Sequence, residues 1–346
     1  DELQDTISKW IRKGNFYKIA ELWTKGGNIF WQQLYHNETP KKVSLPSYPF
    51  SKDRYWVPQI ETNTITSKSL LERGSRLHPL LHENTSDFQV QRYSSVFTGH
   101  EFFLKDHVVG GKLFFPGVAY LEMVRAALVS VSTTPLSINS VLGIEISNVV
   151  WLKPMIVSEH AASIHINLLP NEEYLVDFQI YADGTGSQNE EVFCQGRAIV
   201  KEQQPIKIDL ASQKERCNGR SLNMQECYEI FSHARIDYGV TFQTIKTLYL
   251  GKDIALAKLE LPDVISDTID EFGLHPSLLD GALQASLGLL LQDPDTSSQS
   301  TSSNVPFALN QIKIIDKLNK NMWAVIGYSQ GSARGDAVQK IDMSFY

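Results

Sequence analysis

Two apolar helical segments, each opened by a proline, lie far apart in this chain of 346 residues. The first covers 116–131, and its apolar stripe consists of Val118, Leu121, Val124, Leu128 and Val131. The second covers 276–291, where leucine and alanine surround nearly the whole circumference. Short segments with alternating or β-branched residues flank both helices, at 88–93, 163–169, 174–182, 191–200, 245–262, 305–315 and 322–329. This weak internal repeat predicts an α+β fold in which a curved antiparallel sheet wraps round a central helix, twice.

The residues before the repeat have a different character. Residues 1–60 contain two short amphipathic helices, about 4–13 and 15–24, and then Pro46 and Pro49 among aromatic residues. Closely spaced prolines favour an extended segment that lies on another surface. The polar residues that follow indicate a flexible connection. We therefore divide the chain into 1–60, 61–77, 78–205 and 206–346, and expect a low-complexity surface loop at 293–304.

Composition excludes several classes of protein. The net charge is −7, and no basic run is interleaved with aromatic residues, which argues against nucleic acid as the main partner. Cys194, Cys217 and Cys227 are odd in number and widely spaced, which predicts reduced thiols. The histidines show no metal-like spacing. No apolar stretch matches a membrane span or a signal peptide. We predict a cytoplasmic protein with no metal and no membrane or nucleic-acid partner.

Asp280 is the first candidate for chemistry, because it lies within the apolar helix that begins at Pro276. Gln284 is four residues further on and therefore shares its face. A buried aspartate resists ionisation and has a raised pKa, which is what a general acid requires. Gln284 would hold its orientation by a hydrogen bond. The alternative is that the Asp280–Gln284 edge meets solvent or a neighbouring backbone.

His107 is the candidate base, since it precedes Gly110-Gly111 and a helix start at Pro116-Gly117. The two glycines allow a close approach of backbone. The first N–H groups of a helix lack intrahelical partners, so the Gly117 amide is a candidate oxyanion donor. A structural histidine, and a glycine that only permits close helix–strand packing, are the competing interpretations.

Tyr238 and His275 complete the set. Tyr238-Gly239 precedes Val-Thr-Phe242, which indicates either a turn that aims the hydroxyl into a cleft or a core aromatic in a bend. His275 is expected to cap the following helix. A phosphate-binding glycine loop and a GxSxG motif are both absent from the sequence.

Two of these groups resemble motifs of a known family, the dehydratase domains of modular polyketide synthases. His107, Gly111 and Pro116 match its HxxxGxxxxP motif, and Asp280 and Gln284 match its D-x-x-x-Q/H motif. The starting segment His78-Pro79-Leu80-Leu81 and the later Val305-Pro306-Phe307 are similar too. Residues 1–60 resemble the linker that precedes such domains and wraps over an upstream synthase domain.

The resemblance implies a double hotdog fold and the removal of water from a 3-hydroxyacyl thioester. In that family the substrate is carried on the phosphopantetheine of an acyl carrier protein, and the enzyme needs no cofactor of its own. The implied roles are proton removal by His107, protonation of the departing hydroxyl by Asp280, thioester binding by the Gly117 amide, orientation of Asp280 by Gln284 and pocket lining by Tyr238. The implied partners are the carrier protein, neighbouring synthase domains and a second copy in a homodimer.

One motif departs from the family pattern. The family has GYxYGPxF where this chain has Arg235 to Phe242, so that Arg235, Ile236 and Val240 replace glycine, tyrosine and proline. Loss of the proline is expected to loosen the turn that aims Tyr238. Efficiency and substrate placement are affected more than the class of reaction.

Three other functions are compatible with the same fold. The first is a double-bond isomerase or cyclising variant, although such relatives typically replace the aspartate that is retained here as Asp280. The second is an inactive docking module, supported only by the altered tyrosine motif. The third is thioester hydrolysis, which the fold alone does not exclude.

Overall fold

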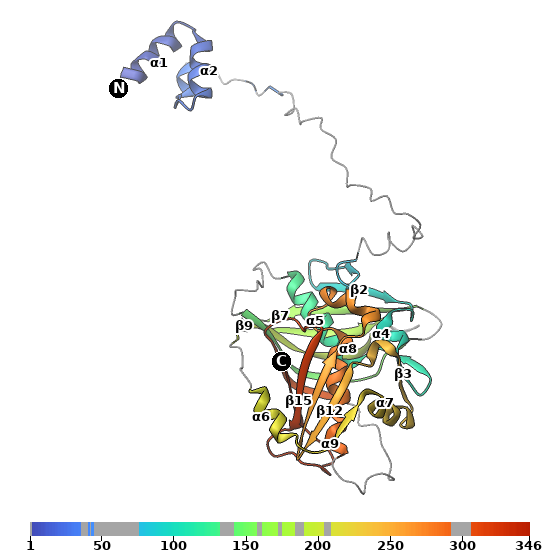
Figure 1. The fold of residues 1–346 in the computed structure, drawn as a ribbon. Helices are drawn as coiled ribbons and strands as arrows, with labels where there is room; N and C mark the ends of the chain where they lie inside the picture. Colours follow the sequence, from blue (N-terminus) through green and yellow to red (C-terminus); the bar gives the residue numbers. More distant parts are fainter. Residues whose placement is uncertain are drawn as a thin grey trace, which may run out of the picture. The chain divides into compact units, whose positions relative to one another are not determined.

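The computed structural model describes residues 2–35, 41, 43–44, 76–131, 142–157, 161–171, 175–183, 190–203, 209–291 and 306–346. The chain divides into two compact units, Asp1–Thr64 and Ile65–Tyr346, which we treat separately (Figure 1). The predicted proline-containing segment, nearly all of the connection 61–77 and the loop 293–304 lie outside the described residues.

The N-terminal unit is helical. It contains α1 (Glu2–Arg12), α2 (Phe16–Thr24) and the 3₁₀ helix η1 (Trp31–Leu34). Both helices expected there are confirmed. Ile7 of α1, Ile19 of α2 and Ile29, which follows α2, pack together, so the unit has a small hydrophobic core of its own.

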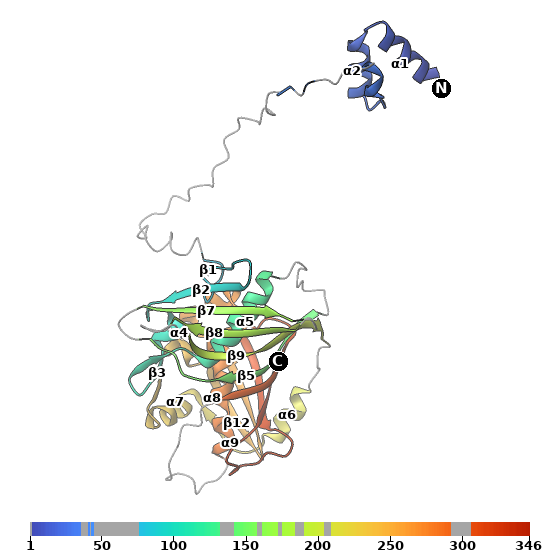
Figure 2. The same cartoon turned by 180° about the vertical axis from the view of Figure 1, so that it is seen from behind.

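The larger unit contains a seven-stranded antiparallel sheet, in which the order is β1-β2-β7-β8-β9-β5-β14 (Figure 2). The strands are β1 (Glu83–Asn84), β2 (Gln91–Phe97), β7 (Ala162–Pro170), β8 (Val176–Ala182), β9 (Glu191–Glu202), β5 (Leu142–Trp151) and β14 (Ala308–Ile314). Helix α5 (Gly117–Val131) packs against β5 and β7. The sheet's alternation of buried and exposed residues gives α5 an apolar face to cover.

A second, five-stranded antiparallel sheet has the order β10-β12-β13-β15-β16. Its strands are β10 (Ser221–Asn223), β12 (Ile245–Gly251), β13 (Ile254–Glu260), β15 (Asn321–Tyr328) and β16 (Ile341–Phe345). Helices α8 (Pro276–Ala285) and α9 (Leu287–Leu290) pack on one face of β13. On its other face, α6 (Leu210–Arg216) packs on Ile254 and Leu256. The predicted fold, two antiparallel sheets each packed on a proline-opened helix, is confirmed.

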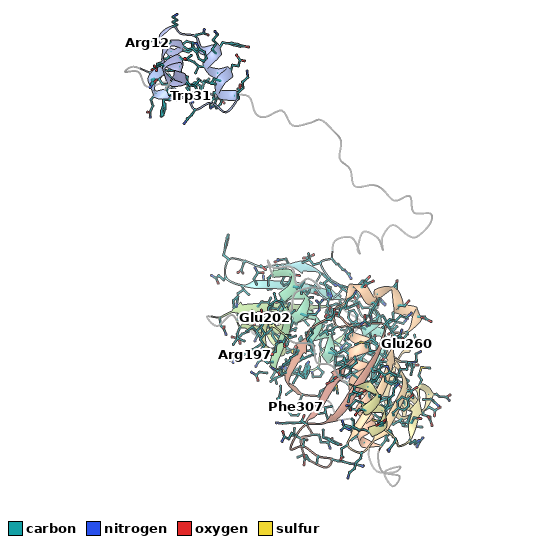
Figure 3. The ribbon with its side chains drawn as sticks, turned by 60° about the vertical axis from the view of Figure 1, so that its left-hand side comes forward. Arg12, Trp31, Arg197, Glu202, Glu260 and Phe307 are labelled. Atoms are coloured by element: carbon teal, nitrogen blue, oxygen red, sulfur yellow. The ribbon has the colours of Figure 1, made fainter. Side chains whose placement is uncertain are left out.

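The two repeats are joined by shared sheets and a shared core. A third sheet has the order β11-β3-β4-β6, from β11 (Ile236–Tyr238), β3 (His107–Val109), β4 (Lys112–Phe114) and β6 (Ile156–Val157). Strand β11 comes from the second repeat and the other three from the first, while β14 of the second repeat extends the first sheet. One hydrophobic cluster includes residues of both α5 and α8, which touch. Side chains fill the space between ribbons, with Glu202 at the end of β9 and Glu260 at the end of β13 (Figure 3).

Several element boundaries differ from the predictions, and two of these differences are caused by side-chain hydrogen bonds. The strand expected at 88–93 begins only at Gln91, since the Asp87 carboxylate accepts the amides of Gln89 and Val90 and forms a turn. The helix expected over 276–291 is interrupted at Ser286. There the Ser286 amide and hydroxyl both donate to the carbonyl of Leu283, which tightens the turn.

Candidate active site

A two-residue β-hairpin places His107. Gly110 (φ +56°) and Gly111 (φ +78°) form the turn between β3 and β4, where Val109 pairs with Lys112. Two consecutive positive φ angles are typical of hairpin turns and strongly favour glycine. Nothing lies within 4 Å of a Cβ built at either position. The chain therefore needs these glycines for their φ angles, and the backbone of Arg235 approaches Gly110 on a side that a Cβ would not block.

The hydrogen bonding of His107 leaves one ring nitrogen available. Its Nδ1 lies 2.9 Å from the carbonyl oxygen of Phe114. A carbonyl can only accept, so Nδ1 carries the hydrogen and the neutral ring has its free lone pair on Nε2. The half-buried ring lies 5.3 Å from that of Phe242 and 5.9 Å from that of Tyr238, measured between centroids. This geometry suits a base that accepts a proton at Nε2.

Helix α8 carries Asp280 into the interior. His275 is its N-cap and accepts the amide of Ser277, as predicted, and Pro276 occupies the first turn. Burial lowers the pKa of His275 to about 4, so that it remains the neutral acceptor this cap requires. Asp280 is only 6% exposed and accepts a hydrogen bond of 2.8 Å at Oδ2 from Gln284 Nε2. The alternative of a solvent-facing edge is wrong.

Burial raises the pKa of Asp280, while the charge of His107 and the hydrogen bond from Gln284 oppose that rise in part. The charge of an ionised Asp280 also raises the pKa of the Tyr228 and Tyr238 hydroxyls, so both tyrosines lie within its electrostatic reach. Asp280 therefore keeps its proton to a higher pH than an exposed aspartate does. Gln284 donates to Oδ2, so Oδ1 is the oxygen available to carry a proton. The structure thus brings a candidate base and a candidate acid, one from each repeat, within electrostatic reach.

Tyr228 of α7 (Met224–His233) fixes the Gln284 amide, a role that sequence reasoning missed. Its hydroxyl lies 2.9 Å from Gln284 Oε1 and 3.1 Å from the carbonyl of Phe242, and it accepts the amide of Ile245 at 3.1 Å. Gln284 Nε2 also donates to Phe242 at 3.2 Å. The sequence around Tyr228 indicates only the capping box at Asn223, where α7 begins. It does not indicate the contact with Gln284, because that residue lies 56 positions further along the chain.

Tyr238 is paired directly opposite His107 in the register of β11 and β3. Its ring stacks on Phe242 with an interplanar angle of 17° and meets Phe231 edge-on at 5.2 Å. Burial raises the pKa of its hydroxyl well above the usual range. Tyr238 is thus a neutral phenol beside the candidate base.

Asp106, another residue that sequence reasoning missed, holds the turn after Tyr238. The amide of Gly239 donates to the Asp106 carbonyl at 2.8 Å, and that of Thr241 donates to its Oδ2 at 3.0 Å, at the start of η2 (Val240–Phe242). A Cβ on Gly239 would collide with the Asp106 side chain, so only glycine fits. The turn is therefore fastened from β3, without the proline that Val240 replaces.

Arg235 stands where the family motif has its first glycine, and it adopts the left-handed conformation that favours glycine, with φ +60°. Its carbonyl accepts the Gly110 amide at 3.2 Å, which ties this bend to the β3–β4 turn. A side chain in this region of φ carries backbone strain. The substitution therefore keeps the backbone path of the motif at an energetic cost.

Gly117 is the first residue of α5, directly after Pro116, so its amide has no acceptor within the helix. Its carbonyl accepts a 3.0 Å hydrogen bond from the Trp151 indole. A Cβ at Gly117 would lie 3.5 Å from Trp151 Nε1, which is an ordinary contact. Close packing therefore does not require this glycine, and the amide remains a candidate oxyanion donor.

The described residues include no candidate metal centre, disulfide or membrane-spanning helix. Within the described ranges no group of three or more His, Cys, Asp or Glu residues is placed to hold a metal ion. Cys194, Cys217 and Cys227 are free and buried, and burial raises the pKa of Cys194 and of Cys227 to about 12. None of the helices that the structure describes has the length and apolar character to cross a membrane.

Comparison with known proteins identifies the class and then the family. The crystal structure of a trans-AT PKS dehydratase domain from Brevibacillus brevis is 39% identical, with a TM-score of 0.70 over 79% of this chain and 93% of that chain. The dehydratase domain of RzxB from Pseudomonas fluorescens is 28% identical, with a TM-score of 0.68 over 78% of this chain and 94% of that chain. The larger unit is thus a double hotdog, as the resemblance implied.

Two family models match the same unit. One is described as the polyketide synthase dehydratase domain and covers residues 78–183, and the other as the polyketide synthase dehydratase N-terminal domain and covers residues 207–346. The chain belongs to the polyketide synthase dehydratase family. The polyketide synthase PksN of Bacillus subtilis (strain 168) is 38% identical over an aligned length of 350 residues, and the match covers 99% of this chain and 6% of PksN. The chain therefore spans only a small part of such relatives.

Proposed function

We propose that this chain removes water from a 3-hydroxyacyl thioester and releases the α,β-unsaturated thioester. The observation that carries this proposal is the pairing of His107, whose Nε2 is free to accept a proton, with Asp280, whose burial raises its pKa. Dehydration needs a base for the proton beside the carbonyl and an acid for the departing hydroxyl. The chain also belongs to a family of dehydratase domains, in which a base paired with an acid is expected.

The proposed step balances protons and bonds within one acid–base pair. His107 Nε2 takes a proton from the carbon next to the thioester carbonyl, and the electrons of that bond form the new double bond. The carbon–oxygen bond breaks as Asp280 Oδ1 gives its proton to the hydroxyl, which leaves as water. After the step His107 holds the proton taken from the substrate carbon, and Asp280 is ionised because its proton has left with the water. Transfer of one proton from His107 to Asp280, directly or through a water molecule, restores the starting state.

The surrounding groups support that step. The Gly117 amide, at the positive end of α5, would hold the thioester oxygen as negative charge develops on it. Gln284, fixed by Tyr228, would keep Oδ1 of Asp280 facing the substrate. Tyr238 would line the pocket beside His107. All of this is acid–base chemistry, so the proposal requires no cofactor of the chain's own.

The proposed setting follows from the relatives, which are multidomain polyketide synthases. The substrate would be carried on the phosphopantetheine of an acyl carrier protein, with other synthase domains as neighbours. Residues 1–60 would serve as the linker from an upstream domain. A homodimer in the cytoplasm is the expected assembly.

The test is mass spectrometry of an acyl carrier protein loaded with either enantiomer of a 3-hydroxyacyl chain. Loss of one water from one enantiomer, abolished in His107→Ala and Asp280→Asn but kept in the surface control His233→Ala, is the expected result. Free acid would indicate hydrolysis instead. If no mass changes, an enoyl thioester is offered: a shifted double bond would indicate an isomerase, and no change an inactive docking module.

A further inference from the structure

A second carboxylate, Glu122, is fully buried in the middle of α5, where the proposed chemistry does not use it. Its two oxygens accept the amide of Gly273 at 2.7 Å and that of Leu274 at 2.8 Å. Those residues belong to the other repeat, about 150 positions later in the sequence. Glu122 therefore joins the helix of the first repeat to the backbone of the second, and α5 and α8 lie in contact (Figure 1).

The position of that joint matters, because Leu274 directly precedes His275, the N-cap of α8. His275 is buried and its ring stacks on that of Phe102, with centroids 5.6 Å apart. This packing holds the start of α8 against Phe102. Asp280 lies between one and two helical turns further on. The 273–274 backbone is therefore joined to Asp280 by a buried cap and less than two turns of helix.

The charge of Glu122 is matched locally. Arg125 donates to both of its oxygens, at 2.6 Å and 2.8 Å, and His78 Nε2 lies 3.1 Å from Oε1. His78 Nδ1 accepts the amide of Leu80, so the hydrogen is on Nε2 and points at Glu122. Burial alone would raise the pKa of Glu122, but the bonds from Arg125 and His78 outweigh it and the pKa is lowered. We call Glu122, Arg125 and His78 the Glu122 cluster.

Gly273 shows how closely the two repeats meet at this cluster. A Cβ built on Gly273 would collide with the Arg125 guanidinium. A substituent there would push Arg125 away from Glu122 without changing either side chain. Position 273 therefore offers a way to disturb the cluster from the second repeat.

We propose that the Glu122 cluster is a positioning device, which sets the placement of Asp280 relative to His107 by anchoring the start of α8 to α5. The inference rests on the proposed function of that site. It also assigns a role to His78, the first residue of the His78-Pro79-Leu80-Leu81 segment. The proposed acid–base step gives His78 no role. Neither Glu122 nor its partners would touch the substrate.

The test compares Glu122→Gln, Gly273→Ala and the milder Arg125→Lys, which keeps the charge but loses the two-point hydrogen bond. Glu145→Gln is the control. Glu145 is a buried carboxylate on β5 of the first repeat, and it forms an ion pair of 2.8 Å with Lys201 on β9, outside the Glu122 cluster. We expect kcat for dehydration to fall about 10–100-fold in Glu122→Gln, the cost of a catalytic group displaced by about 1 Å, with little change in KM. We expect a smaller fall in kcat in Gly273→Ala than in Glu122→Gln, and the smallest fall in Arg125→Lys.

A second readout does not depend on turnover. The ionisation of Asp280 is followed by carbon-13 NMR of its carboxyl, which is faced by His107, Gln284, Tyr228 and Tyr238. His107 lowers the pKa of Asp280, so a cluster variant that separates the two should raise it, in the direction that His107→Ala defines. Glu145→Gln should leave it unchanged.

The outcomes separate the two proposals. A wild-type protein without dehydratase activity refutes the proposed function, and the NMR measurement then still tests the positioning role. A folded cluster variant with wild-type kcat and wild-type titration of Asp280 refutes the positioning role. If Glu122→Gln does not fold, Arg125→Lys decides, and an unchanged kcat and titration in that variant refute the inference.

Discussion

Removing the hydroxyl of Tyr228 should weaken both the fold and the site. In Tyr228→Phe the ring remains, but Gln284 Oε1 and the Ile245 amide each lose a partner in a nearly solvent-free region, since Gln284 is 3% and Ile245 0% exposed. A buried polar group without a partner costs about 1–3 kcal/mol, so the loss of two should lower the free energy of unfolding by about 2–6 kcal/mol. At about 2–4 °C per kcal/mol for a large domain, Tm should fall by roughly 4–24 °C.

The same variant should change activity in two ways. Without Tyr228 to fix it, the Gln284 amide no longer holds Asp280, and we expect kcat for dehydration to fall about tenfold. The Gln284 hydrogen bond lowers the pKa of Asp280, so losing it raises that pKa. Asp280 must be protonated to act, and activity should therefore persist to higher pH in the variant.

Calorimetry and the pH dependence of kcat test both expectations. The matched control is Tyr181→Phe, which removes a buried tyrosine hydroxyl that donates to Asn167 at 3.3 Å on the first sheet. Wild-type Tm together with a wild-type pH profile in Tyr228→Phe would show that the Tyr228–Gln284 contact does not orient Asp280. An equal loss of activity in Tyr181→Phe would show that the effect is not specific to the site.

Three further predictions concern single positions. Arg235→Gly should relieve the backbone strain at φ +60° and raise the free energy of unfolding by about 0.5–1 kcal/mol. We expect Tm to rise by about 1–3 °C, and a lower Tm would contradict the strain argument. Gly117→Ala should leave Tm within about 2 °C of wild type, since the added methyl makes only ordinary contacts. It should lower kcat/KM about tenfold, because the methyl crowds the amide proposed to bind the thioester oxygen. A large fall in Tm would instead support the interpretation that Gly117 is needed for packing. Asp280→Asn should abolish dehydration but become more stable relative to wild type as pH rises. The native state keeps the Asp280 proton where the unfolded chain has released it, so wild-type stability falls as pH rises from about 4 to the raised pKa. A Tm difference that is independent of pH would contradict this.

The candidate residues differ in how far the sequence could predict them. Asp280 and Gln284 are linked by a helical spacing of four, so their shared face and hydrogen bond followed from local geometry. Tyr228 and Asp106 gave no comparable signal. Asp106 reaches Thr241 across 135 positions and Tyr228 reaches Gln284 across 56, and no periodic pattern encodes such pairs.

The sequence by itself determined the two proline-opened helices, the burial of Asp280 and the motifs that indicate the family, because each depends on neighbours within a few residues. Only the tertiary structure decided that β11 pairs with β3, so that Tyr238 faces His107, and that Glu122 anchors the start of α8. Register and long-range hydrogen bonds depend on how the two repeats pack against each other. That packing is chosen by the burial of one common core, which is a property of the whole chain.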